Sequence, residues 1–214
     1  MKQPTTIATA AHVKQAVAYL KTRCTTMCHV HEIAGDPPLR RYASGFKGLA
    51  RIVVGQQLSI ASAKAIYGRL QDICPDLQPE TFLATSTESL KKAGLSRAKI
   101  ETLRNLAKAV LHDTMSLTKP PEDALETFRA SLLQQKGIGP WTVDIYEMFC
   151  LGRADAFAPG DMALQEAARR AFTLESRPTS TELLEIANRW RPQRTVAACL
   201  LWSYYATDRR KPLS

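Results

Sequence analysis

The sequence predicts an all-α protein, and three observations support this. Apolar residues recur three and four positions apart through most of the 214-residue chain. No run alternates apolar and polar residues, and no pair of strand-like runs flanks a tight turn. Breaks rich in proline and glycine separate the helical stretches, without a fixed repeat or a low-complexity segment.

The helical stretches can be placed in order along the chain. The clearest periodicity covers residues 60–70, 100–111 and 196–204. Turn-forming residues gather at 35–38, 75–76, 119–121 and 177–178. Ile52-Val53-Val54 resembles a strand, but it lies in a stretch of helical period that begins at Phe46, so we expect a helix there.

Length and composition restrict the class of protein. A mass of 23.7 kDa fits one domain or two small lobes, and 45% hydrophobic residues is normal for a globular chain. No apolar run is long enough to span a bilayer. Lys14 interrupts the one N-terminal apolar run, so we expect no signal peptide. With five cysteines, an odd number, we expect reduced thiols and a cytoplasmic protein.

The net charge of +9 is unevenly distributed along the sequence. Residues 1–110 carry 16 basic and 7 acidic side chains, whereas residues 111–214 carry 13 of each. A basic excess favours a polyanionic partner such as nucleic acid. From charge alone, a merely basic soluble protein explains the composition equally well.

A glycine-rich turn joins two predicted helices at Lys136-Gly137-Ile138-Gly139-Pro140. Two glycines permit a tight turn with positive φ, and Pro140 suits the first position of the second helix. Backbone N–H groups at such a helix N-terminus can bind a phosphate without charged side chains. Taken alone, the segment also fits an ordinary helix–helix turn.

A second candidate is Asp161, which follows the turn sequence Pro159-Gly160 and precedes an apolar run. The simplest interpretation is a helix N-cap. The helix dipole also favours the ionised carboxylate at this position, which would suit a group that stabilises a developing cation.

The three tryptophans are Trp141, Trp190 and Trp202. Tryptophan usually packs in a core. Trp141, directly after the glycine turn, could instead stack on a nucleobase. Cys24, Cys28, His29 and His31 lie close together in sequence, but their spacing is not that of a typical zinc site, so we expect no metal there.

Together these residues resemble the helix-hairpin-helix (HhH-GPD) superfamily of base-excision DNA glycosylases, in particular its 3-methyladenine DNA glycosylase II branch. The resemblance starts from the segment 132–142, after which Asp161 follows Trp141 by 20 positions, as the catalytic aspartate does in the superfamily. Further matches cover residues 46–59, 94–99, 190–194 and 201–202.

The resemblance implies two helical lobes with a cleft between them. Residues 1–44 and 156–214 would form a terminal lobe, and residues 45–155 a central lobe with the helix-hairpin-helix at 126–150. We expect no counterpart in this chain to the extra N-terminal sheet domain of larger members.

The resemblance also assigns roles to residues. Asp161 would be catalytic, and Trp141, Trp202, Tyr204 and Phe46 would line a pocket for the flipped base. Gly137, Gly139, Lys136 and Thr142 would bind the DNA backbone, with room for a monovalent cation at the hairpin carbonyls. Gln57 or Leu58 would fill the gap left in the duplex.

Two features select among superfamily members. Bifunctional members carry a lysine nucleophile where this chain has Trp141, so we expect a monofunctional enzyme. The scattered cysteines, none of them beyond Cys199, exclude the C-terminal iron–sulfur cluster of other branches.

The implied function is hydrolysis of the N-glycosidic bond of alkylated purines in duplex DNA. We expect a monomer without cofactor, acting at the nucleoid in a bacterium or in the nucleus of a eukaryote. Two alternatives remain open: a glycosylase for deaminated or oxidised bases such as hypoxanthine, and a noncatalytic DNA-binding module.

Overall fold

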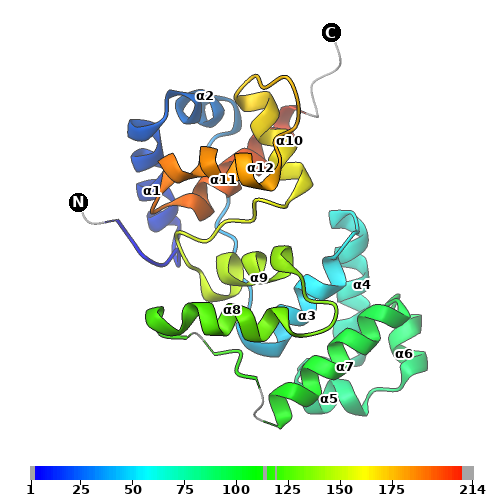
Figure 1. The fold of residues 1–214 in the computed structure, drawn as a ribbon. Coiled ribbons are helices and arrows are strands. Elements are labelled where there is room, and N and C mark those ends of the chain that lie inside the picture. Colours follow the sequence, from blue (N-terminus) through cyan, green and yellow to red (C-terminus); the bar gives the residue numbers. More distant parts are fainter. Residues whose placement is uncertain (1–2, 113–114, 119, 209–214) are drawn as a thin grey trace. The chain divides into compact units, whose positions relative to one another are not determined.

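The computed structural model describes residues 3–112, 115–118 and 120–208, and the prediction of an all-α fold is confirmed (Figure 1). Within these residues, β-structure is limited to one isolated bridge between Thr6 and Arg153. The α-helices are α1 (Ala10–Arg23), α2 (Thr25–Ala34), α3 (Gly45–Gly55), α4 (Ile60–Ile73), α5 (Pro79–Ala84), α6 (Thr87–Lys92), α7 (Arg97–Leu111), α8 (Leu125–Leu133), α9 (Pro140–Tyr146), α10 (Met162–Ala171), α11 (Ser180–Ala187) and α12 (Arg194–Asp208). Short helical turns η1 (Glu122–Ala124), η2 (Glu147–Leu151) and η3 (Asn188–Trp190) lie between them.

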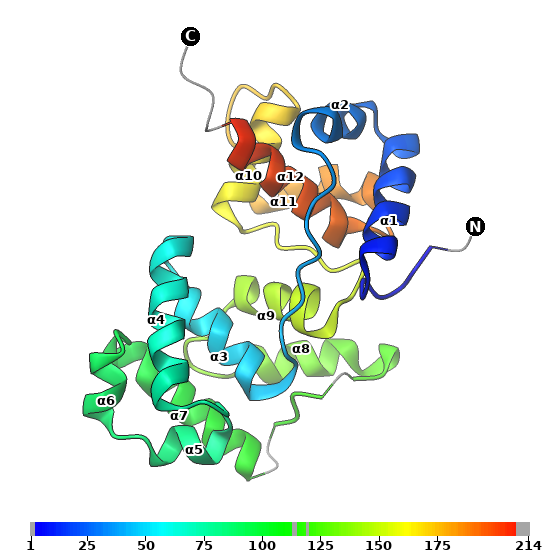
Figure 2. The ribbon, with the colours of Figure 1, turned by 180° about the vertical axis from the view of Figure 1, so that it is seen from behind.

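The chain forms two compact units. Unit 1 combines residues 1–41 with 147–214, and unit 2 is the continuous segment 42–146. Figure 2 shows the extended chain that leaves α2 of unit 1 and leads to α3 of unit 2.

Unit 1 is built around α12. This helix buries nearly all of its first two turns, from Thr195 to Leu201, and packs against α1, α2 and α10. Trp190, which is fully buried, packs on Phe157 and Phe172 with ring centroids 6.0 Å apart in each pair. The core of unit 1 therefore depends on helices from both ends of the sequence.

Unit 2 is built around α3, which packs against α4, α7 and α9. Phe46, Leu49 and the strand-like triplet Ile52-Val53-Val54 are buried, which explains the unusually apolar sequence of this helix. Serine caps the following helices: Ser59 accepts a hydrogen bond from Ser62 N at the start of α4, and Ser96 accepts one from Lys99 N at the start of α7.

The structure also shows the surroundings of the cysteines and of the possible metal ligands named from the sequence. The five cysteines are free thiols, four of them buried. His31 pairs with Asp36 at 2.8 Å, and no group of three potential metal ligands exists among the described residues. No helix within the described part of the chain is both long enough and apolar enough to cross a membrane.

Candidate active site and nucleic-acid interface

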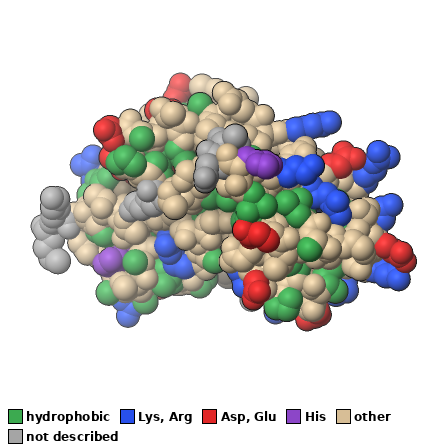
Figure 3. Space-filling view, turned by 90° about the horizontal axis from the view of Figure 1, so that it is seen from below, with side chains coloured by type: hydrophobic (Ala, Val, Ile, Leu, Met, Phe, Trp, Pro, Cys, Tyr) green, Lys and Arg blue, Asp and Glu red, His purple; other side chains and the backbone are tan. Residues whose placement is uncertain are grey.

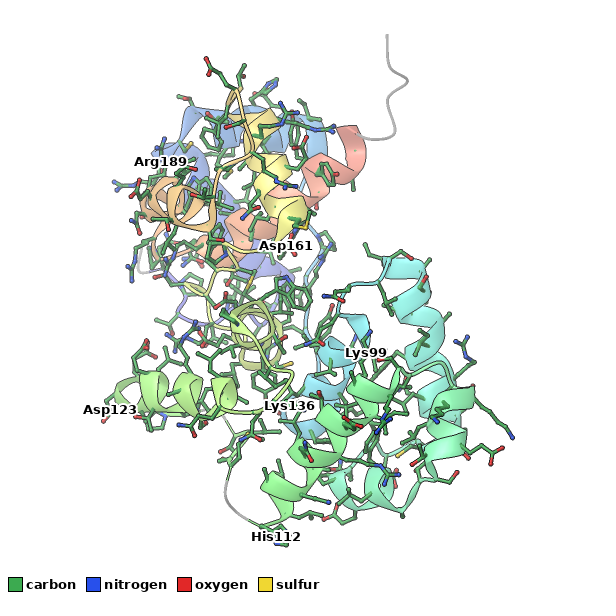
Figure 4. The ribbon with its side chains drawn as sticks, turned by 45° about the vertical axis from the view of Figure 1, so that its right-hand side comes forward. Lys99, His112, Asp123, Lys136, Asp161 and Arg189 are labelled. Atoms are coloured by element: carbon green, nitrogen blue, oxygen red, sulfur yellow. The ribbon has the colours of Figure 1, made fainter. Side chains whose placement is uncertain are left out.

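Asp161 is the N-cap of α10 (Figure 4). Its Oδ1 atom accepts a hydrogen bond of 2.8 Å from Leu164 N, so the bond that starts the helix also orients the carboxylate. The side chain is partly exposed. The structure therefore has the helix cap that the sequence predicted, at a site accessible from solvent.

The same oxygen accepts a second hydrogen bond, from the indole of Trp202. Trp202 Nε1 lies 3.0 Å from Asp161 Oδ1, and the ring packs on Phe149 with centroids 6.0 Å apart. Because α10 packs directly on α12, these two residues meet although they lie far apart in sequence. The carboxylate and the N–H edge of the indole thus form one hydrogen-bonded pair.

The face of Trp202 also holds a cation in this structure. The guanidinium carbon of Arg40 lies 5.6 Å from the centre of the Trp202 ring, a cation–π geometry. Sequence reasoning missed Arg40, since it lies in the irregular segment after α2 and carries no local motif.

The segment before Asp161 is fixed by the start of α12. Thr195 Oγ1 donates to the carbonyls of Arg153 (2.6 Å) and Ala156 (2.8 Å). Arg194 donates to both carboxylate oxygens of Asp155, at 2.8 and 3.1 Å, in the bidentate geometry that positions groups well. The helix that carries Trp202 therefore also holds the loop that leads to Asp161.

Charged side chains that follow Asp161 on α10 form ion pairs with one another. Hydrogen bonds from Arg169, then Arg170, lower the pKa of Glu166 to about 2, so this acid remains ionised beside both arginines. Burial raises the pKa of Cys199 on α12 to about 11, so it is a poor nucleophile at neutral pH.

Two further residues of unit 1 lie on the same pair of helices. Tyr204, a predicted pocket residue, lies on α12 and is buried. Met162, the first residue of α10, is 64% exposed directly after Asp161. Sequence reasoning passed over Met162, an apolar residue directly after the candidate carboxylate of Asp161.

In unit 2 the predicted hairpin connects α8 to α9, and only one of its glycines has positive φ. Gly137 has φ +89°, and a Cβ there would overlap the Thr102 hydroxyl of α7. Gly139 lacks a positive φ and has open space where a Cβ would point. The positive φ that the glycine turn permits is therefore found at Gly137, where the fold requires glycine, whereas Gly139 has open space beside it.

The polar groups of the hairpin are already engaged in part. Gln56 Nε2 donates to Gly137 O at 3.1 Å and to Thr142 Oγ1 at 2.9 Å, and Thr142 is buried. Gly139 O accepts from the amides of Thr142 and Val143. Thr142 therefore lies in the protein interior, where it supports the hairpin, and not on the surface. A cation at the hairpin would need to bind carbonyl oxygens other than that of Gly139.

The remaining predicted residues of unit 2 differ in exposure. Lys136, at the start of the hairpin, is exposed, and Trp141, directly after it, is partly exposed. Phe46 is buried and packs edge-on against Phe82 at 5.6 Å, so its position is that of a core residue.

The turn between α3 and α4, residues 56–59, presents side chains to solvent. Gln57 is exposed and has φ +56°, an uncommon conformation for a residue other than glycine. Leu58 is 39% exposed, and Ile60, two residues on, is 86% exposed. Ile60 is a further apolar candidate for contact with DNA that sequence reasoning did not select.

These features define a class: an all-helical protein with a glycine hairpin between two helices and a helix-capping aspartate bonded to an indole. Residues 50–193 match the family model described as HhH-GPD superfamily base excision DNA repair protein. The chain belongs to this superfamily, and the family predicted from its motifs is confirmed.

Individual relatives agree with this assignment. The chain is 30% identical over 162 residues to the alkylbase DNA glycosidase-like protein mag2 of Schizosaccharomyces pombe, covering 73% of this chain and 76% of the relative. It is similar in structure to S. pombe 3-methyladenine DNA glycosylase (Mag1) in complex with abasic DNA, with a TM-score of 0.79, 27% identity and coverage of 88% and 95% of the two chains. It is also similar to a DNA-3-methyladenine glycosidase of Bacillus halodurans, with a TM-score of 0.73, 30% identity and coverage of 99% and 95%.

The two hairpin glycines give matched variants for a stability test. Gly137→Ala should lower the free energy of unfolding by about 2 kcal/mol, because alanine is strained at positive φ and meets Thr102. Gly139→Ala should change it by less than about 0.5 kcal/mol. Urea unfolding followed by circular dichroism measures both; equal destabilisation would contradict distinct roles for the two glycines.

Proposed function

We propose that this protein is a monofunctional DNA glycosylase that hydrolyses the N-glycosidic bond of alkylated purines in duplex DNA. The observation that carries the proposal is the hydrogen-bonded pair of Asp161 and Trp202, a partly exposed carboxylate joined to an aromatic ring. The matching names of its relatives, alkylbase and 3-methyladenine DNA glycosylases, support the same reaction.

The chemistry follows from the leaving group. In a 7-methylguanine or 3-methyladenine nucleotide, the base is electron-poor or cationic, so the bond from C1′ to nitrogen breaks with its electron pair on the base. The negative charge of Asp161 stabilises the oxocarbenium-like sugar that develops. A water molecule then adds to C1′, and Asp161 or solvent takes its proton.

Selection of a cationic base is supported by the environment of Trp202. The ring takes the Arg40 guanidinium on its face. An alkylated purine with positive charge offers the same type of cation–π contact and would replace Arg40 there. Tyr204, also on α12, is a further aromatic group that we assign to the base pocket, and in unit 2 we assign Trp141 to stacking on a nucleobase.

Unit 2 would bind the duplex. Amides around Gly137 and Gly139 would bind a phosphate, which can approach closely because Gly139 has no side chain. Lys136 would add a salt-dependent contact. Gln57 or Leu58, on the exposed turn after α3, would fill the space left by the flipped nucleotide.

The proposal also states that the protein does not cleave the DNA strand and that it acts as a monomer. Trp141 stands where bifunctional superfamily members carry the lysine that forms a Schiff base, so no strand cleavage is expected. We infer a monomer, since one chain supplies the carboxylate, the hairpin and the exposed turn. It would act where the DNA is, at a bacterial nucleoid or in a nucleus.

The direct test is Asp161→Asn. Asparagine can still cap α10 and accept the bonds from Leu164 and Trp202, so folding should be preserved. The single-turnover rate of base release from 7-methylguanine DNA should fall by about 100-fold or more, because the negative charge is lost. Affinity for the same duplex should stay within about twofold.

Asp123→Asn is the control for this test, since it removes an equal charge from an exposed position in η1. It should leave both the rate and the affinity unchanged. If Asp161→Asn excises the base at the rate of the unmodified protein, Asp161 has no catalytic role.

A comparison of lesions tests the role of Trp202. Trp202→Leu removes the aromatic face, so excision of cationic 7-methylguanine should fall about tenfold more than excision of neutral hypoxanthine. Trp202→Phe keeps a π face without the indole donor and should retain most of that preference. Single-turnover kinetics on matched duplexes would measure this, and an equal loss on both lesions would contradict cation selection by the ring.

A further inference from the structure

The C-terminal end of α3 is held by a lysine from α7. Lys99 Nζ donates to the carbonyl oxygens of Val54 (2.8 Å) and Gln56 (2.9 Å). Carbonyls at the end of a helix have no partner within the helix, so a side chain or water must satisfy them. Burial lowers the pKa of Lys99, in agreement with an ammonium group turned toward protein oxygens (Figure 4).

Gln56 extends this link to the hairpin. Its own carbonyl accepts the bond from Lys99, while its side-chain amide donates to Gly137 O and to Thr142 Oγ1. One residue is therefore fixed through its backbone by α7 and through its side chain by the hairpin.

A third contact closes the network. Thr102 lies one turn after Lys99 on α7, and its hydroxyl lies so close to Gly137 that no Cβ fits between them. The helix α7 thus contacts the end of α3 through Lys99 and the hairpin through Thr102. We refer to Gln56, Lys99, Thr102 and Gly137 as the α7 network.

The α7 network sets the direction of the exposed turn at residues 56–59. The Gln56 carbonyl belongs to the peptide that leads into Gln57, whose left-handed conformation is uncommon for its residue type. A hydrogen bond to this carbonyl fixes the plane of that peptide, and so the direction in which Gln57 and Leu58 leave the helix.

We propose that Lys99 and Gln56 are positioning residues, which hold the turn that enters the duplex at a fixed place relative to the phosphate-binding hairpin. This inference rests on the proposed function, in which the hairpin binds the backbone and Gln57 or Leu58 fills the gap. Phosphate binding at the hairpin would then place the turn beside the nucleotide to be flipped. Lys99 has the charge expected of a DNA contact, but its hydrogen bonds go to carbonyl oxygens of the protein itself.

The competing role for Lys99 is a direct phosphate contact, and the two roles differ in their dependence on salt. Loss of a phosphate contact reduces the slope of log affinity against log salt by about one. Loss of a positioning residue leaves this slope unchanged and affects the steps that follow binding.

The experiment compares Lys99→Met with Lys108→Met, which removes the same charge from an exposed position on the same helix. Duplexes carry 2-aminopurine beside 7-methylguanine, so fluorescence reports unstacking and base release reports excision. Lys99→Met should reduce unstacking and single-turnover excision at saturating protein about tenfold or more, because small displacements of an active geometry are costly in rate. Its affinity for undamaged duplex and its salt slope should equal those of Lys108→Met.

Two further variants keep the test decisive. Lys99→Arg preserves a donor for both carbonyls and should restore unstacking. Gln56→Met keeps the Lys99 bond but breaks the link to the hairpin, so it should show the same defect in unstacking even if Lys99→Met does not fold.

The proposal is overturned if Lys99→Met lowers the salt slope by one while excision at saturation is unchanged, or if Gln56→Met unstacks the base normally. Failure of the proposed function is distinguishable: the unmodified protein would then release no base from any duplex, whatever the variants do.

Discussion

Two helices of unit 1, α10 and α12, are joined at one oxygen atom, Asp161 Oδ1. It starts α10 through the Leu164 amide and binds the indole of Trp202 on α12. The two bonds join the helix cap to the best-buried helix of the unit, whose first residues also anchor the loop before Asp161. The carboxylate is therefore held in place by elements that must form for unit 1 to fold. A catalytic charge that is oriented before the substrate binds needs no reorganisation in the reaction.

The hairpin of unit 2 follows a similar principle with backbone groups. Contact with Thr102 requires glycine at position 137, and hydrogen bonds from Gln56 hold the turn from the other side. A Cβ at Gly139 would meet open space. A rigid turn of this kind is suited to bind a phosphate by its amides. Basic side chains would then contribute mainly to the general electrostatic attraction of DNA, and less to the binding of a phosphate at the hairpin.

Charge is distributed differently in space from its distribution in the sequence. The sequence halves carry +9 and zero, but unit 1 has 16 basic and 10 acidic side chains and unit 2 has 13 and 10. Several of these cations are paired within the protein, such as Arg194 with Asp155 and Arg129 with Asp144. Figure 3 shows acidic side chains interspersed among the basic ones on one face. The basic first half of the sequence is therefore divided between the two units.

Local signals were sufficient to predict the helices, the hairpin and the cap at Asp161, because periodicity, glycine pairs and capping residues act over a few positions. Contacts between distant segments were not predictable in this way. The bond from Gln56 to Gly137 spans 81 positions and is created by the packing of α3 on α9. For the same reason Phe46 and Thr142, selected by resemblance, lie in buried positions. A resemblance to a family indicates which residue types occupy given positions. Whether those side chains are exposed depends on how this chain packs.

We propose above all that this protein breaks a glycosidic bond and leaves the DNA strand intact. Incubation with a duplex containing one 7-methylguanine, with analysis of free base by mass spectrometry and of the strand by gel before and after alkali, tests it directly. We predict release of 7-methylguanine, a strand that is intact until alkali cleaves the abasic site, and no covalent adduct after borohydride. Strand cleavage without alkali, an efficient adduct, or no released base would contradict the claim.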